Sequence, residues 1–523
     1  MTDFSTYQPP GVYVQDVSTP VVTPSGSAAS LVTIVGPASG YETVTESVAL
    51  HISPGVGLAN RGVFTTAVTG PPAIAAPVVK TAAGLILTPG VDYSFTVDTS
   101  GGGGAANAVA LLVRLPSGGP TTPTPNGANE GDIVQVTYSF TDPDYYSPTL
   151  FSSYDLLAAT YGTALATAAP SNPNTSQVAS PLTYAAQVAF ENGAGQVLAL
   201  ATNPADGDLR TQLQTAYAKL LSNPNVAIIV PLMADGLVYG VSTTDAHTAS
   251  AVENMISDVR LHCDTSAAQG FGRIAIVGPD RTYDSATEPF PALAKLVADK
   301  RVVLAYPNRL LTYNPATSQT IEVGGMYLAA AYAGQLAYNK VARGLTRMAV
   351  RSFTGLPPVV AQAMTRSAND AMSQAGVAVT ELNRLGAMVV RHGVTTDPTS
   401  LTTREISLVR IADTLLQLVQ SGLDFVGLIG QPIDAEMPTK VKGAVSTILE
   451  NARLNEVILA WGNLQVRQQS LPNGDPTVIE VRFAYAPAVP LNYVEVSFSI
   501  DLVTGDLTGP STPPAQSSTG TAP

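Results

Sequence analysis

Two stretches near the end of the chain, 478–485 and 494–502, alternate between apolar and polar side chains. A period of two residues is typical of a β-strand with one buried face. The apolar positions are Ile479, Val481, Phe483 and Tyr485 in the first stretch, and Val494, Val496, Phe498, Ile500 and Leu502 in the second. Only a tail rich in Pro, Ser, Thr and Gly follows them. The pattern therefore predicts strands whose partners come from earlier in the chain or from another chain.

A short strand is also predicted close to the N-terminus. Residues 11–17 place Val12 and Val14 on one face, with Tyr13 between them. The run 18–27, which consists mostly of Ser, Thr, Pro and Gly, separates this strand from the next apolar piece at 31–35. Such a linker leaves the strand free to reach another sheet. We therefore expect residues 1–27 to form an arm with its linker.

The next hundred residues show no helical period. Short strand candidates at 85–87, 93–97 and 133–140 are separated by a glycine run at 101–104 and a proline-containing segment at 120–125. Breakers at this spacing favour β-structure over helices. The sequence predicts an inserted, small β-rich domain over residues 41–150.

From residue 151 onward, helical stretches alternate with short, unbroken apolar runs. The runs lie at 196–202, 226–231, 273–278 and 302–307, and the amphipathic stretches at 182–192, 209–221, 246–268 and 291–299. Strands of a parallel sheet are covered on both faces by helices, so they are apolar throughout. We expect an α/β domain built from residues 28–40 and 151–325.

For the rest of the chain, the sequence predicts an α+β C-terminal domain over residues 326–507, followed by a disordered tail at 508–523. An Ala-rich segment at 327–338 comes first, then 359–369 and 373–383 as short helices or irregular connections. Helices are expected at 403–421, with Gly422 as the stop signal, and at 438–451. Residues 457–467 and the two alternating stretches complete the domain. The predicted fold class is thus α/β and α+β multidomain, with extended terminal arms.

Composition restricts the function. Of 523 residues only 12% are charged, against 45% hydrophobic, which favours a large protein with much subunit contact. The net charge of −13 argues against nucleic-acid binding, which needs a basic surface. The single cysteine, Cys263, excludes a disulfide framework. Residues 1–10 lack a signal-peptide pattern, and no apolar run reaches membrane-spanning length, so we expect a soluble protein made in the cytoplasm.

The sequence contains little that would support catalysis. No phosphate-binding loop motif is present, and the four histidines show no metal-ligand spacing. His262 next to Cys263 is interpreted as part of a buried helix rather than a thiol site, because adjacent helical side chains point in different directions. Asp280 and Asp284 form an acidic pair that binds a cation, serves acid/base chemistry or caps the next helix, and we favour capping. We therefore assign no catalytic, cofactor-binding or metal-binding residue.

One basic segment stands out in this acidic chain. Residues 340–410 carry nine cationic side chains against four carboxylates. They are either an ordinary solvated face or a surface that docks on an acidic surface of another subunit. The cationic residues are Lys340, Arg343, Arg347, Arg351, Arg366, Arg384, Arg391, Arg404 and Arg410, of which the first four are our inter-subunit charge candidates.

Several short motifs, in this order, resemble the contractile-tail sheath proteins of myovirus-type bacteriophages. They are Pro10-Gly11-Val12-Tyr13-Val14, Leu31-Val32-Thr33-Ile34-Val35-Gly36, Asp92-Tyr93 with the strand at 134–140, and the closing segment 478–501. The segment Leu382-Asn383-Arg384-Leu385-Gly386 is similar to a Leu-Asn-x-x-Gly element of the family. The Trp-Gly-x-Arg-Thr element that often follows it in the family is absent here.

The resemblance implies a structural protein without enzymatic activity or cofactors. Subunits would stack as hexameric rings around a tail tube, add β-strands to neighbouring subunits, and contract to drive the tube through the host envelope for genome ejection. The α/β domain would be subtilisin-like but non-catalytic. Implied partners are the protein itself, the tail tube protein, and baseplate and tail terminator proteins, without direct nucleic-acid contact or membrane insertion; the location is the virion tail, after assembly in the host cytoplasm. The inter-subunit strand candidates are Val12, Tyr13, Val14, Ile479, Val481, Phe483, Val494, Val496, Phe498 and Ile500.

Two other classes remain open from the residues alone. One is an α/β hydrolase-like enzyme built on the middle domain. The other is a capsid or surface structural protein that does not contract.

Overall fold

The computed structural model describes residues 31–38, 42–52, 56–57, 78–98, 109–114, 123–140, 143–169, 177–203, 206–233, 249–283, 289–471 and 474–492. The chain divides into a large unit that ends at Val489 and a short one from Pro490 onward. The fold of the large unit is mixed α/β, with one large, mostly parallel sheet and several small sheets.

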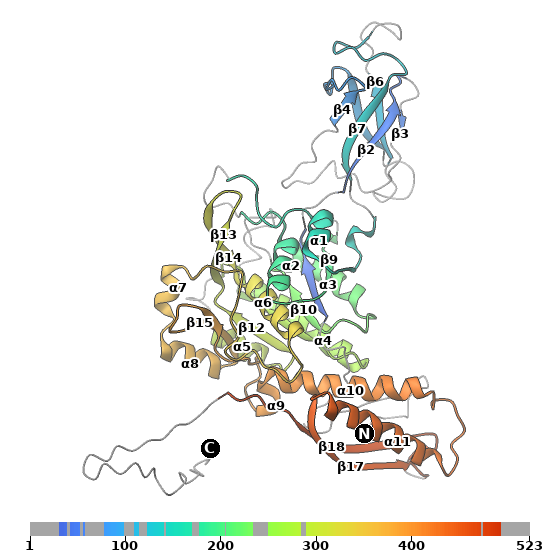
Figure 1. Cartoon of the computed structure of the whole chain (residues 1–523), viewed down its shortest axis with the longest axis vertical. Coiled ribbons are helices and arrows are strands. Elements are labelled where there is room, and N and C mark those ends of the chain that lie inside the picture. Colours follow the sequence, from blue (N-terminus) through green and yellow to red (C-terminus); the bar gives the residue numbers. More distant parts are fainter. Residues whose placement is uncertain are drawn as a thin grey trace, which may run out of the picture. The chain divides into compact units, whose positions relative to one another are not determined.

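An eight-stranded sheet forms the centre of the large unit (Figure 1). Its order is β16-β15-β12-β11-β10-β1-β9-β8, and only the edge strands β16 and β8 run antiparallel to their neighbours. β1 is an inner strand, with Ile34 opposite Val230 of β10 and Ala199 of β9. The strands are β1 (Val32–Gly36), β8 (Thr149–Phe151), β9 (Val197–Ala201), β10 (Ile228–Pro231), β11 (Ile274–Val277), β12 (Val302–Tyr306), β15 (Val377–Leu382) and β16 (Met388–Val390). The four apolar runs predicted as parallel strands are confirmed.

Helices bury both faces of this sheet in two separate apolar cores. One core is formed with α1 (Tyr154–Tyr161), α2 (Pro181–Glu191) and α6 (Gly325–Tyr338), and the other with α3 (Leu209–Leu220), α4 (Ala249–Ala268) and α5 (Phe290–Val297). α2 and α6 approach closely, because a Cβ at Gly334 would lie 2.3 Å from the backbone oxygen of Ala189. The short helices α7 (Pro358–Ala363) and α8 (Arg366–Gln374) precede β15, and a hairpin of β13 (Arg309–Asn314) and β14 (Gln319–Gly324) precedes α6.

Three expectations about the fold are wrong. Residues 85–87 do not form a strand, since only Ile86 makes an isolated bridge, to Lys80. Residues 373–383 are not a helix or an irregular connection, since 377–382 form β15, whose first four residues are fully buried beside β12. The central sheet therefore extends past residue 325, the limit expected for the α/β domain. Gly422 does not end its helix, because α10 (Ile406–Val426) continues through it to Gly427. A Cβ at Gly422 would lie 2.5 Å from Ile448 Cδ1, so this glycine permits close packing of α10 on the next helix.

The inserted segment forms two antiparallel, three-stranded sheets. One has the order β2-β7-β4 and the other β3-β6-β5. Val79, Val134 and Val136 are buried inside the first, and the strand predicted at 133–140 is confirmed as β7. A 3-10 helix, η2 (Pro143–Tyr146), follows. The strands are β2 (Glu42–Ala49), β3 (Val56–Gly57), β4 (Val78–Thr81), β5 (Tyr93–Asp98), β6 (Val109–Arg114) and β7 (Ile133–Phe140).

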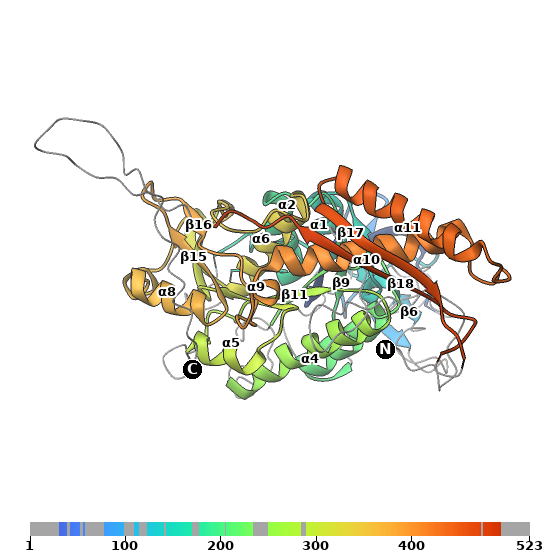
Figure 2. The ribbon, with the colours of Figure 1, turned by 90° about the horizontal axis from the view of Figure 1, so that it is seen from below.

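The C-terminal part of the large unit packs two helices on a β-hairpin (Figure 2). After α9 (Leu401–Arg404) come α10, α11 (Met437–Leu454), β17 (Ile458–Gln468) and β18 (Ile479–Pro487). Leu415, Val445 and Leu449 are buried in the core between them. Within the described ranges, no helix is long and apolar enough to cross a membrane.

Candidate assembly surfaces

Within the described residues, β17 and β18 form a sheet of only two strands. Val466 pairs with Val481 and Trp461 with Tyr485, and the register shifts between Gly462 and Gln465. Among the residues that the structure describes, neither strand pairs with a third strand. A two-stranded sheet is marginal by itself, and the edge of a sheet presents a row of backbone N–H and C=O groups to which another strand can pair. Both outer edges are therefore candidate sites for strand addition.

The two faces of β18 differ as the alternation predicted. The apolar side chains of Ile479, Val481, Phe483 and Tyr485 are half-buried against the core of α10 and α11. On the other face, the Glu480 carboxylate accepts hydrogen bonds from Arg467 Nε and Arg482 Nε, both at 2.7 Å. Burial opposes ionisation of Glu480, but these two guanidinium groups outweigh it and lower its pKa. One face thus fixes the sheet on the subunit, while the other carries charge.

The other strand candidates lie outside the described residues. These are Val12, Tyr13 and Val14 near the N-terminus, and Val494, Val496, Phe498 and Ile500 after β18. Of the ten positions, the structure places only Ile479, Val481 and Phe483, all on β18.

Helix α10 joins this hairpin to the body of the subunit through buried charged groups. Arg301, the residue directly before β12, donates two hydrogen bonds to the Asp413 carboxylate, at 2.7 and 3.0 Å. The side chains of Arg301 and Asp413 are 3% and 8% exposed. Burial alone would lower the pKa of Arg301, but the Asp413 charge raises it above the ordinary value. Arg410, one turn earlier, donates through Nη2 to the backbone oxygen of Leu336 at 2.9 Å.

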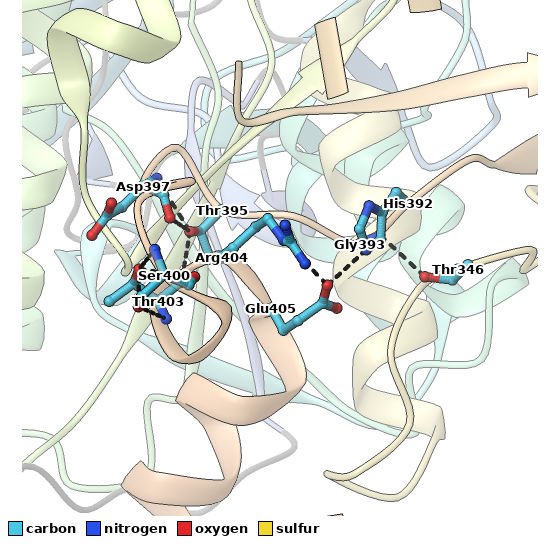
Figure 3. A network of polar contacts seen from close by, with 9 residues as sticks. All are labelled: Thr346, His392, Gly393, Thr395, Asp397, Ser400, Thr403, Arg404 and Glu405. Carbon is cyan, nitrogen blue, oxygen red and sulfur yellow. Dashed lines mark hydrogen bonds and ion pairs between the residues drawn. The ribbon is translucent and has the colours of Figure 1, made fainter. Parts of the chain in front are cut away.

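The start of α10 is fixed by a second polar network, shown in Figure 3. Glu405, 1% exposed, lies directly before the helix, with its Oε1 2.7 Å from His392 Nε2 and 3.6 Å from Arg404 Nε. Thr395 Oγ1 donates to the backbone oxygen of Thr403 at 2.6 Å, and Ser400 and Thr403 form a capping box around α9. Segment 392–397 therefore holds the helix where it leaves the body.

The basic segment is not one continuous surface. Arg410 is buried, and Arg391 lies between Glu381 and Asp370. Arg347 is exposed but pairs with Glu381 at 3.2 Å, and Lys340 pairs with Glu456. Lys340, Arg343, Arg347 and Arg351, the four inter-subunit charge candidates, are all exposed.

The candidate catalytic groups are structural. Cys263 is fully buried, and burial raises its pKa to about 12. His262 accepts a hydrogen bond from Arg273 Nη1 at 2.7 Å, and burial, followed by the Arg273 charge, lowers its pKa to about 3. The interpretation of this pair as buried is confirmed. Asp280 Oδ1 accepts from the backbone N–H of Thr282 and Tyr283 at 2.8 and 3.0 Å, so it caps a turn rather than a helix. Asp284 lies outside the described residues.

Comparison with known proteins decides the family. No protein-family model matches the chain. The sequence is 32% identical over 461 residues to the tail sheath protein of Mycobacterium phage Bxz1, a match that covers 86% of this chain and 71% of that protein. The chain belongs to the tail sheath proteins. The resemblance to this family is thereby confirmed, and this sheath protein is a structural component of a contractile tail, not an enzyme.

The fold agrees with this family. The helical sheath of the anti-feeding prophage in its contracted state superimposes with a TM-score of 0.51 at 11% identity, over 95% of this chain and 100% of that one. At this identity the likeness concerns the fold alone.

Sequence reasoning missed the buried link between α10 and the body of the sheath protein. Arg410 and Asp413 stand within the apolar stripe of α10, three residues apart. A charged side chain inside a buried stripe needs a partner, because an unpaired buried charge is strongly unfavourable. Their position in the apolar stripe is therefore the signal that could have identified Arg410 and Asp413 as buried, in contrast to the exposed charged residues.

Proposed function

We propose that this protein polymerises as stacked hexameric rings around a tail tube, with subunits linked by β-strand addition, and contracts to drive the tube through the host envelope. Membership of the tail sheath family supports this proposal. The partners would be further copies of the chain, the tail tube protein, and baseplate and tail terminator proteins. The sheath would assemble in the host cytoplasm and remain in the virion, without binding nucleic acid or inserting into the membrane.

The observation that carries the strand-addition step is the open-edged sheet of β17 and β18. Its apolar face already packs on α10 and α11. This packing supports Ile479, Val481 and Phe483 as part of the sheet that would receive the strand. The donated strands would be residues 12–17 of a neighbouring copy, with Val12 and Val14 on its apolar face, and residues 494–502 of the same or another copy. Two added strands would convert a marginal hairpin into a four-stranded sheet.

Such a link would be strong enough to keep the subunits of a polymer joined while their bodies move. A donated strand that makes about five backbone hydrogen bonds, each with a net value of ~1 kcal/mol, contributes on the order of 5 kcal/mol before apolar burial is added. The linker at 18–27 and the segment after Pro487 would let the bodies rotate while the strands stay paired. Contraction would then release energy stored in an extended, kinetically trapped lattice.

The roles that we propose for the parts of the chain follow the expected domains. Residues 1–27 form the arm, 41–150 the inserted β-rich domain, and 508–523 the tail. The α/β domain comprises 28–40 and 151–325, enlarged by β15 and β16, and the assembly domain extends to residue 507. Lys340, Arg343, Arg347 and Arg351 would contact an acidic surface of a neighbouring subunit, which favours correct register.

Deleting residues 1–17 tests this function. The expected result is a folded monomer with an unchanged melting temperature that forms no tubes in negative-stain microscopy, because the donated strand is lost. A matched control removes residues 508–523, which carry no predicted strand, and retains tubes. Tubes of ordinary length from the chain without its arm would contradict strand addition. Closed shells from the full chain would contradict a contractile sheath.

A further inference from the structure

Two hairpin tips expose large apolar side chains to an unusual degree. Phe425, in the last turn of α10, is 93% exposed, and Leu385, in the turn between β15 and β16, is 92% exposed. No other large hydrophobic side chain in the described part of the chain is as exposed as these two. Aromatic and aliphatic side chains at such positions are the usual anchors of protein interfaces.

The first tip is apolar and acidic. We define the α10–α11 tip as residues 424–436; Val426 and Ile429, at 49% and 46% exposed, lie beside Phe425 in sequence. The segment carries Asp424, Asp434 and Glu436 and no cation. Lys440 of α11 offsets part of this charge, through contacts of 3.3 Å with Asp434 and 3.8 Å with Glu436.

This tip projects from the subunit body. Ile406, at the other end of α10, is fully buried in a core of the central sheet. Phe425 follows it by 19 residues, which at 1.5 Å per residue is about 28 Å along the helix axis. The buried pair of Arg301 and Asp413 fixes the direction of the helix. The apolar tip therefore lies far from the core that holds the start of α10.

The second tip is apolar and basic. We define the β15–β16 turn as residues 382–387, which contain Leu382, Arg384 and Leu385 and no carboxylate. Arg351 lies beside it, because the backbone N–H of Val350 donates to the Met388 oxygen at 2.9 Å. Within the described ranges, the structure shows no ion pair for Arg351 or Arg384, although Arg347 and Arg391 nearby share Glu381.

We propose that the α10–α11 tip of one copy docks on the β15–β16 turn of a second copy. Phe425 packs against Leu382 and Leu385, and the carboxylates of the tip face Arg351 and Arg384. The opposite charges favour this pairing, whereas tip against tip or turn against turn would bring like charges together. A contact between two different surfaces of the same chain is heterologous, so it propagates into rings or helices instead of closing a dimer. The inference rests on the proposed sheath function and identifies one contact within it.

Site-specific cross-linking of the full-length protein tests the contact directly. Two single variants, Phe425→Cys and Leu385→Cys, are polymerised separately and as an equal mixture, then treated with a short bismaleimide. Both substitutions are at exposed positions, and the native Cys263 is fully buried, so it contributes little background. The proposal predicts cross-linked dimers in the mixture and almost none in either variant alone. The control mixture replaces Leu385→Cys by Leu471→Cys, at a site 74% exposed, and gives no dimer.

The outcomes separate the contact from the proposed function. Tubes without mixed dimers overturn the contact and leave the sheath function standing. Dimers of Phe425→Cys alone overturn it in favour of a tip-to-tip contact, and cross-links only to added tube protein overturn it in favour of tube binding. A full-length chain that forms no tubes under any condition overturns the sheath function and the contact together.

Charge reversal provides an independent measurement. Arg384→Glu should raise the concentration needed for polymerisation about tenfold or more at low ionic strength, because it places like charges opposite one another. Adding Asp424→Arg in the same chain should restore most of the loss. A double variant as impaired as the sum of its single variants would overturn the pairing.

Discussion

The central sheet and the hairpin of β17 and β18 are built in opposite ways. Every residue of β1, β10 and β12 is buried, and these strands have neighbours on both sides within the same chain. In β17 only Ile458 is buried, and neither strand of the hairpin has a third partner among the described residues. The inner strands of the first sheet have both partners within the same chain, whereas each described strand of the second has one open edge that another strand can pair with.

This difference predicts that substitutions in the two sheets affect folding and assembly to different degrees. Changes in the central sheet should affect the free energy of unfolding, and changes in the hairpin should affect polymerisation more than unfolding. Helix α10 belongs to both regions, since its start lies in a core of the body and its later residues pack on α11. Changes in the buried contacts of α10 should therefore affect both the free energy of unfolding and polymerisation.

Replacing Asp413 by Ala should have the largest effect on stability. It leaves the Arg301 guanidinium buried without its carboxylate, and loss of one partner from a buried pair costs about 3–5 kcal/mol. Urea unfolding measures the change. Asp434→Ala is the matched control, because it removes a solvent-exposed carboxylate that pairs with Lys440 and should leave the midpoint unchanged. Equal effects of the two variants would show that α10 is not anchored through Asp413.

Acidification should weaken the body through His262. The unfolded histidine takes up a proton below a pH of about 6.5, whereas the folded one stays neutral until its lowered pKa of about 3. Between these values only the unfolded chain binds the proton, so the free energy of unfolding falls by up to ~1.4 kcal/mol per pH unit from this group. Arg273 and Tyr217 are the groups that contact the ring.

His262→Gln is the comparison for this prediction, because its amide oxygen can still accept from Arg273. Urea unfolding of both proteins at several pH values between 7 and 4 isolates the histidine, since the carboxylates are common to both. The two curves should diverge as the pH falls, with the wild type losing more. Parallel curves would show that folding does not lower the pKa of His262.

The sequence predicted the central strands because burial on both faces leaves an unbroken apolar run, as in 226–231 and 302–307. It missed β15, since Val377-Ala378-Val379 is followed by Thr380 and Glu381 and gains its strand partners only from the folded sheet. Gly422 was misread because a glycine that permits helix contact and one that ends a helix look alike until Ile448 is in place. The alternation of 478–485 gave the faces of β18 correctly, but no pattern in one strand reports how many partners its edges have.

The smallest effect on unfolding, and the sharpest separation of the two regions, should come from Phe483→Ala. This side chain is half-buried on β18, so its loss should reduce the free energy of unfolding by about 1 kcal/mol. Leu304→Ala in β12, 1% exposed, should cost about 2–5 kcal/mol because it leaves a cavity in the core. Polymerisation, followed by sedimentation below both melting temperatures, should reverse this order, because Phe483 packs the hairpin on the helices and the proposed donated strand would add to an edge of that hairpin. If the two variants lost polymerisation in proportion to their stability, assembly would depend on general stability and not on the open sheet.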